Sequence, residues 1–68
     1  MELRQNTILT DQEIVGKGVK GDWFVKYMGV IVFVKEPKEL VKGLRLGDKV
    51  NLRVLASQNN CALAEVVV

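Results

Sequence analysis

The sequence contains no histidine and a single cysteine, Cys61. Without histidine there is no imidazole for acid–base chemistry near neutral pH, no Ser-His or Cys-His nucleophile pair, and no Cys/His set of the kind that holds structural zinc. A lone cysteine excludes an internal disulfide and is typical of a reducing compartment. We therefore expect a cytoplasmic protein that is not an enzyme, needs no metal or other cofactor, and has no small-molecule substrate.

Long apolar runs are absent as well. The longest run, residues 28–34, is interrupted by Gly29 and is far shorter than the about 20 residues that a membrane-spanning helix needs. The residues after Met1 do not resemble a signal-peptide core. These features predict a soluble protein without a membrane partner.

The charge is nearly balanced over the chain but locally biased. Ten lysines and arginines face eight acids, which gives a net charge of +2. Residues 35–53 hold the surplus, because six bases there face only three acids. A basic segment of this kind is compatible with an anionic partner. Its bases are Lys35, Lys38, Lys42, Arg45, Lys49 and Arg53.

Short segments rich in Val, Ile, Leu and aromatic residues alternate with turn residues, which predicts one all-β domain. The expected strands are residues 10–17, 22–27, 30–35, 48–57 and 61–67. Pro37 and Gly43 delimit the one predicted helix, residues 37–42. Residues 1–10 show no firm pattern, so we expect an N-terminal arm or an added sheet edge there and a β-barrel domain over residues 11–68.

Alternation along the strands predicts which side chains face the core. In strand 48–57 the expected inner residues are Val50, Leu52 and Val54, and the expected outer residues are Lys49, Asn51 and Arg53. In strand 22–27 the same parity turns Phe24 and Lys26 outward and turns Trp23, Val25 and Tyr27 inward. Strand 30–35 is apolar on both faces, and parity sends Ile31 and Phe33 outward. A small barrel has one buried layer, so this outer apolar face requires an explanation.

Three glycines alternate with other residues in the segment 16–21, Gly-Lys-Gly-Val-Lys-Gly. Closely spaced glycines can present backbone N–H groups to a phosphate. The spacing fits neither the Walker pattern nor the dinucleotide-binding pattern, and the following residues indicate a strand instead of a helix. We favour a bend between two barrel strands over a nucleotide site.

Aromatic rings and lysines are interleaved in the second and third predicted strands. If these strands are antiparallel neighbours, Phe24 and Phe33 share a face with Lys26 and Lys35, where rings can stack on bases and lysines can neutralise phosphates. The alternative is that the aromatic residues are simply core residues. The row of Lys49 and Arg53 is either a binding contact or a solvated face. Cys61 has no base to activate it, so we expect it to pack inertly.

Several segments together resemble the TRAM domain. They are residues 21–34 (GDWFVKYMGVIVFV), 46–50 (LGDKV) and 62–67 (ALAEVV), and the resemblance extends over roughly residues 11–67. The resemblance implies a small five-stranded antiparallel barrel of the oligonucleotide-binding type that binds RNA. For a stand-alone protein of the archaeal type, it also implies a role similar to that of an RNA chaperone.

The chain departs from the TRAM pattern at three places. Trp23 stands where the family usually has a small residue. The segment 35–47 is longer than the usual connection, and it either adds an anion contact or covers one end of the barrel. The last strand has Cys61 and Leu63 where the family tends to carry aromatic residues, so stacking capacity is lost there.

The function we expect is non-catalytic binding of single-stranded or loop RNA. The candidate RNA-binding residues are Phe24, Lys26, Phe33, Lys35, Lys42, Arg45, Lys49 and Arg53. The alternative is a protein-interaction or dimerising module, in which the apolar third strand and an exposed barrel edge pair with another chain, including a second copy of this one.

Overall fold

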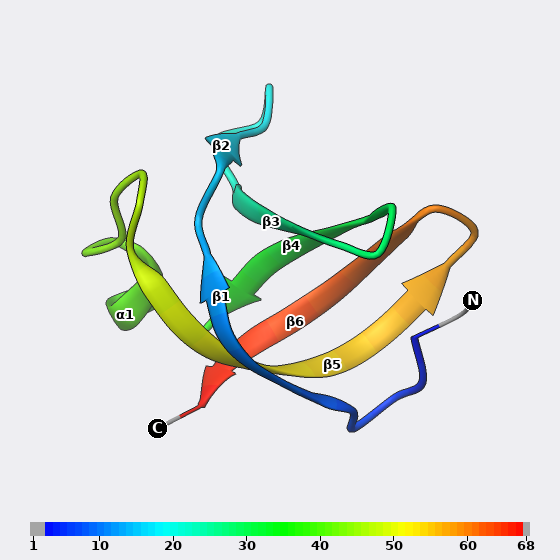
Figure 1. Cartoon of the computed structure of the whole chain (residues 1–68). Helices are drawn as coiled ribbons and strands as arrows, with labels where there is room; N and C mark the ends of the chain where they lie inside the picture. The colour runs from blue at the N-terminus through cyan, green and yellow to red at the C-terminus, as the bar shows by residue number, and fades with distance from the viewer. Residues whose placement is uncertain (1–2, 68) are drawn as a thin grey trace.

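The computed structural model describes residues 3–67, which form six β-strands and one short helix. The elements are β1 (Ile8–Glu13), β2 (Gly16–Lys17), β3 (Trp23–Tyr27), β4 (Val30–Glu36), α1 (Lys38–Val41), β5 (Lys49–Gln58) and β6 (Cys61–Val67) (Figure 1). Residues 1 and 2 of the predicted arm and residue 68 of the predicted barrel lie outside the described residues. In residues 3–67 no helix is long and apolar enough to cross a membrane.

The strands form one sheet in the order β1-β5-β6-β4-β3-β2. β1 and β2 lie at opposite ends of this order, yet only Ile14 and Val15 separate them in the chain. The Ile14 N–H donates to the carbonyl of Asp48 at 2.8 Å, and the Val15 N–H donates to the carbonyl of Phe24 at 3.0 Å. One short bent segment therefore bonds to both ends of the sheet, which curls into a barrel-like shape (Figure 1).

The predicted all-β fold and its coarse barrel form are confirmed, but the five antiparallel strands are not. The predicted strand 10–17 is divided at residues 14 and 15, where its hydrogen bonds change from one neighbour to the other. The pairing of β4 with β6 is parallel. The segment that contains α1 leads from β4 to β5, which runs in the opposite direction to β4. The antiparallel hairpin from β5 to β6 then reverses the chain again, so β6 runs in the same direction as β4.

The core is made of apolar side chains from every strand except β2. Its buried members among the described residues are Leu3, Leu9, Ile14, Val25, Val30, Val32, Val34, Leu52, Val54, Ala62 and Ala64. The predicted inner faces of β3, β4 and β5 are thus confirmed, with Trp23, Tyr27 and Val50 packed partly buried against this cluster. Burial of such side chains supplies most of the stability of a small barrel.

Two segments outside the predicted strands also reach the core. Val41 of α1 and Leu44 after it pack against the buried cluster, so the segment after β4 covers part of the barrel. Leu3 is buried, and the Asn6 N–H donates to the carbonyl of Val54 at 2.7 Å. The chain before residue 11 therefore joins the edge of β5, and the first strand begins two residues earlier than its predicted start.

Candidate nucleic-acid interface

An apolar row crosses the outer face of β3, β4 and β6. Phe24 lies opposite Phe33 in the β3–β4 pair, and Phe33 lies opposite Leu63 in the β4–β6 pair. All three have the opposite parity to the buried residues of their strands, so they point away from the core. The two rings meet edge to face, with centroids 5.9 Å apart and an interplanar angle of 67°. This geometry is favourable by about 0.5–1.5 kcal/mol beyond burial.

The glycine-rich segment 16–21 packs against these rings. A Cβ placed on Gly16 would lie 2.6 Å from Cζ of Phe24, and one placed on Gly18 would lie 3.2 Å from Cε1 of Phe33. The approach at Gly16 leaves no room for a side chain unless the Phe24 ring moves, and the approach at Gly18 is tight. The expected bend between strands is present: Gly16 begins β2, and the Gly18 N–H donates to the carbonyl of Asp22 at 2.8 Å to close the turn.

Two shallow hollows flank Leu63 on this face. The first has a volume of about 330 Å³ and is bordered by Gly18, Lys20, Asp22, Phe33 and Lys35 as well as Leu63. The second has a volume of about 420 Å³ and extends from Leu63 to the β5–β6 turn, where Gln58 and Cys61 border it. The face thus offers two adjoining depressions with Leu63 as their common wall.

Ion pairs occupy the row beside the aromatic residues. The Lys35 ammonium donates to Oδ2 of Asp22 at 2.9 Å, and the Arg53 guanidinium donates to the carboxylate of Glu65. Within residues 3–67 no cluster of three acidic or cysteine side chains is placed to hold a metal ion. Exposed ion pairs of this kind contribute only about 0–1 kcal/mol each, so a phosphate could take the place of either carboxylate.

Lys26 and Lys35 each lie two residues from a ring of the aromatic pair, and Lys26 is the one without an ion pair in the described part of the chain. It follows Phe24 on the same face of β3 and lies opposite Ile31. Lys26 is therefore available to an anion without displacing another partner.

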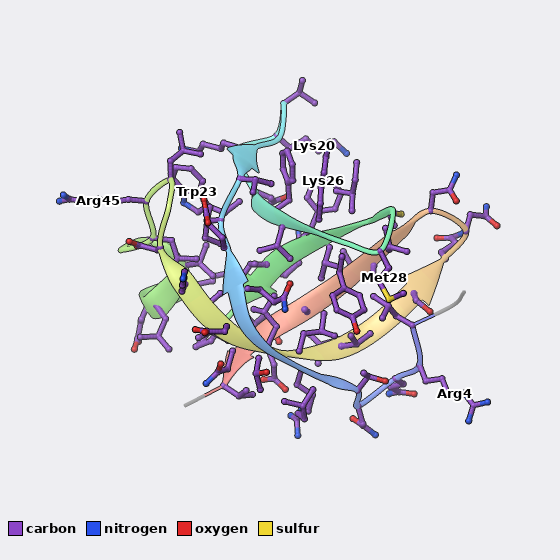
Figure 2. All side chains as sticks on the ribbon, in the orientation of Figure 1. Arg4, Lys20, Trp23, Lys26, Met28 and Arg45 are labelled. Atoms are coloured by element: carbon purple, nitrogen blue, oxygen red, sulfur yellow. The ribbon has the colours of Figure 1, made fainter. Side chains whose placement is uncertain are left out.

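The remaining candidates do not join this face. Lys42 follows α1, Arg45 lies in the turn before β5, and Lys49 lies opposite Glu13 of β1. Figure 2 shows Arg45 and Lys26 projecting from separate parts of the molecule. The structure thus groups Phe24, Lys26, Phe33 and Lys35, places Arg53 two strands away from Lys35, and separates the other three bases from them.

Sequence reasoning missed two bases of the glycine-rich segment. The ammonium of Lys17 lies 5.1 Å from the centroid of the Trp23 ring, a cation–π contact, and Lys20 borders the first hollow. The glycine spacing was the available signal, because a turn that approaches β3 and β4 closely also brings its lysines near side chains of these strands. The expected packing of Cys61 is not observed: its neighbour Ala62 is buried, and strand parity turns Cys61 to the exposed side.

Comparison with known proteins shows the fold. No protein-family model matches this chain, and no curated protein matches it. A conserved protein from the gene locus MMP0076 of Methanococcus maripaludis has a similar solution structure, with a TM-score of 0.74 and 24% identity over 97% of this chain and 83% of that chain. GSP13 from Bacillus subtilis has a TM-score of 0.68 and 18% identity over 94% of this chain and 55% of that chain.

These two neighbours support a small β domain. The chain spans about half the length of GSP13, 55%, so the likeness concerns one part of that protein. At such identities the similarity is one of fold. No family match assigns the chain to the TRAM family.

Proposed function

We propose that this chain is a non-catalytic RNA-binding barrel, similar to TRAM domains, that contacts single-stranded or loop RNA with the outer face of β3, β4 and β6. The observation that carries the proposal is the position of Phe33, whose half-buried ring borders a hollow together with Lys20 and Lys35. Aromatic rings stack on unpaired bases, and lysines neutralise the phosphates between them. Single strands and loops expose both.

The order of the strands supports a barrel of the oligonucleotide-binding type. If β1 and β2 are counted as one bent strand, five strands remain, and the parallel pair β4–β6 joins the third to the fifth. Barrels of this type bind oligonucleotides on the face of their second and third strands and between the loops that flank it. Here that face is β3 and β4, and the flanking loops are residues 18–22 and the β5–β6 turn, which border the two hollows.

A second candidate function rests on the apolar character of the same face. Leu63, 40% exposed, lies opposite Phe33 and extends the apolar row of Phe24 and Phe33 across a third strand. A protein-interaction or dimerising module would bury this row against another chain. Ionic strength separates the two candidates, because phosphate binding weakens as salt rises whereas apolar contact does not.

The test is a titration of the protein with mixed-sequence RNA and DNA oligonucleotides at several salt concentrations. For three or four phosphate contacts to a single strand, the slope of log affinity against log salt should be about −2 to −3. Phe33→Ala should weaken binding by about 1–3 kcal/mol per stacked base and leave that slope unchanged. Lys26→Ala should reduce the slope by about 0.7, since it removes one phosphate contact.

Leu46→Ala is the matched control, because Leu46 is an exposed apolar residue outside this face. It should leave both affinity and slope unchanged. Absence of RNA binding at low salt, combined with a concentration-dependent dimer that Phe33→Asp abolishes, would establish the interaction module in place of the RNA-binding function.

A further inference from the structure

We infer that the hollow beside Phe33 is a base pocket that prefers guanine, and that the Lys35–Asp22 ion pair makes the choice. This inference rests on the proposed function, because it names the base that an RNA-binding face would select. The proposed function alone requires only phosphate contacts and stacking, which do not distinguish one base from another. The inference adds a preference for one base. It depends on the shape of the hollow, on the presence of a carboxylate there, and on the hydrogen-bonding edge of the base.

The hollow has the size and walls that a single base requires. Its volume of about 330 Å³ lies at the lower end of the range for small-ligand sites. Phe33 and Leu63 provide an apolar surface, and the open side faces solvent beside the turn that holds Gly18. Gly18 lies against one edge of the Phe33 ring, since an added Cβ would lie 3.2 Å from Cε1, so a side chain at this position would crowd the ring.

Asp22 is the residue that pure phosphate binding does not explain. Its side chain borders the hollow and is 30% exposed, and a carboxylate at that position repels a phosphate. The turn is closed by the Asp22 backbone carbonyl and makes no use of the side chain. Within residues 3–67 the carboxylate accepts a hydrogen bond only from Lys35, through Oδ2. Its other oxygen, Oδ1, is therefore available to a donor on a ligand.

Guanine has the edge that fits this ion pair best. It presents two adjacent donors, N1–H and the N2 amino group, next to the acceptor O6. Both oxygens of the Asp22 carboxylate can accept from the two donors, while the Lys35 ammonium, 2.9 Å from Oδ2 in the free protein, turns to donate to O6. After this exchange each polar group again has a partner.

The other three RNA bases leave the exchange incomplete. On this edge adenine, cytosine and uracil each present one donor beside an acceptor, so they can donate to Oδ1 and leave Oδ2 with Lys35. Guanine therefore gains one more charge-assisted N–H···O bond to the carboxylate than they do. The structure therefore predicts discrimination by the N2 amino group of guanine.

The experiment compares short oligouridine strands that carry one central guanosine, inosine, adenosine or cytidine, at one fixed salt concentration. Inosine keeps O6 and N1–H and lacks only the N2 amino group. We expect the guanosine strand to bind about tenfold more tightly than the inosine strand and the all-uridine strand, as a bidentate contact to a base typically gives. Single guanosines avoid the self-association of guanine-rich strands.

Asp22→Asn is the informative variant, because an amide cannot accept from both donors. It should abolish the difference between guanosine and inosine and should tighten binding of the all-uridine strand, since a negative charge is lost and Lys35 is released. A purely structural role for Asp22 would instead weaken all strands equally. Asp11→Asn is the matched control: Asp11 is an exposed carboxylate on β1, and its φ of 56° suits asparagine. That control should keep the preference for guanosine.

The outcomes separate this inference from the proposed function. If all strands bind equally well to the unaltered protein, with the salt dependence and the effect of Phe33→Ala intact, the guanine pocket is wrong and RNA binding stands. If no strand binds at low salt, both are wrong.

Discussion

Gly16→Ala tests whether the aromatic pair depends on the glycine-rich segment. The added Cβ would lie 2.6 Å from Cζ and 2.9 Å from Cε2 of Phe24, whereas ordinary contacts begin near 3.4 Å. The Phe24 ring must therefore move by about 1 Å, which disturbs its packing against Phe33, and overpacking of this kind typically costs about 1–3 kcal/mol. Alanine also lowers the conformational entropy of the unfolded chain relative to glycine, which offsets about 0.4–1 kcal/mol of this loss in stability. The expected net loss is about 1–2 kcal/mol.

Thermal unfolding followed by circular dichroism measures this loss. For a domain of this size, about 1 kcal/mol corresponds to a shift of roughly 4–8 °C, so the melting temperature should fall by about 4–16 °C. Gly43→Ala is the matched control, because its Cβ would lie 3.6 Å from the nearest atom, the carbonyl oxygen of Leu40. In a Phe24→Leu background the cost of Gly16→Ala should largely disappear, since the ring is gone. A Gly16→Ala protein as stable as the original would refute the steric argument.

Three further predictions concern the core, the long connection and the last strand. Leu52→Ala should cost about 2–5 kcal/mol because the side chain is fully buried, and it should unfold much of the protein at room temperature, as urea titration would show. Replacing the exposed bases Lys38, Lys42 and Arg45 by Ala should leave the melting temperature nearly unchanged and weaken long RNA more than a strand of about seven nucleotides, because these bases lie apart from the aromatic face. Cys61→Tyr should tighten RNA binding in the same titration by about 1 kcal/mol or more if one further base stacks on the new ring.

Much of the fold could be predicted from local sequence because the strands alternate cleanly. Lys49, Asn51 and Arg53 between apolar residues predicted the faces of β5, and they are exposed. The parallel pairing of β4 with β6 could not be predicted in this way, because alternation defines faces and says nothing about which strands are neighbours. The break at residues 14 and 15 depends on hydrogen bonds to Asp48 and Phe24, which are distant in sequence.

The candidate site was only partly predictable for a related reason. Parity alone brought Phe24 and Phe33 to one face, because their strands are joined by a short hairpin. Lys42 and Arg45 were predicted because residues 35–53 contain many bases, but a count of charges does not show which face of the molecule they lie on. In the structure they are separate from the rings. Lys20 was missed because its proximity to Phe33 depends on the close approach of the turn. Leu63 was noted only as a departure from the TRAM pattern, because its place opposite Phe33 depends on the β4–β6 register.

The contact between glycines and rings also explains how a small barrel tolerates an apolar outer face. The backbone at Gly16 and Gly18 approaches Phe24 and Phe33 closely and both rings are half-buried, while Leu63 and Val19 remain exposed beside Phe33. A stable protein interface buries about 800 Å² on each partner, roughly one sixth of the 4853 Å² that this chain exposes. An interface of that size would have to extend well beyond a row of three side chains. A single base needs only one ring and a nearby cation, and Phe33, Lys20 and Lys35 border the same hollow. On area alone, the face suits a nucleotide better than a second protein.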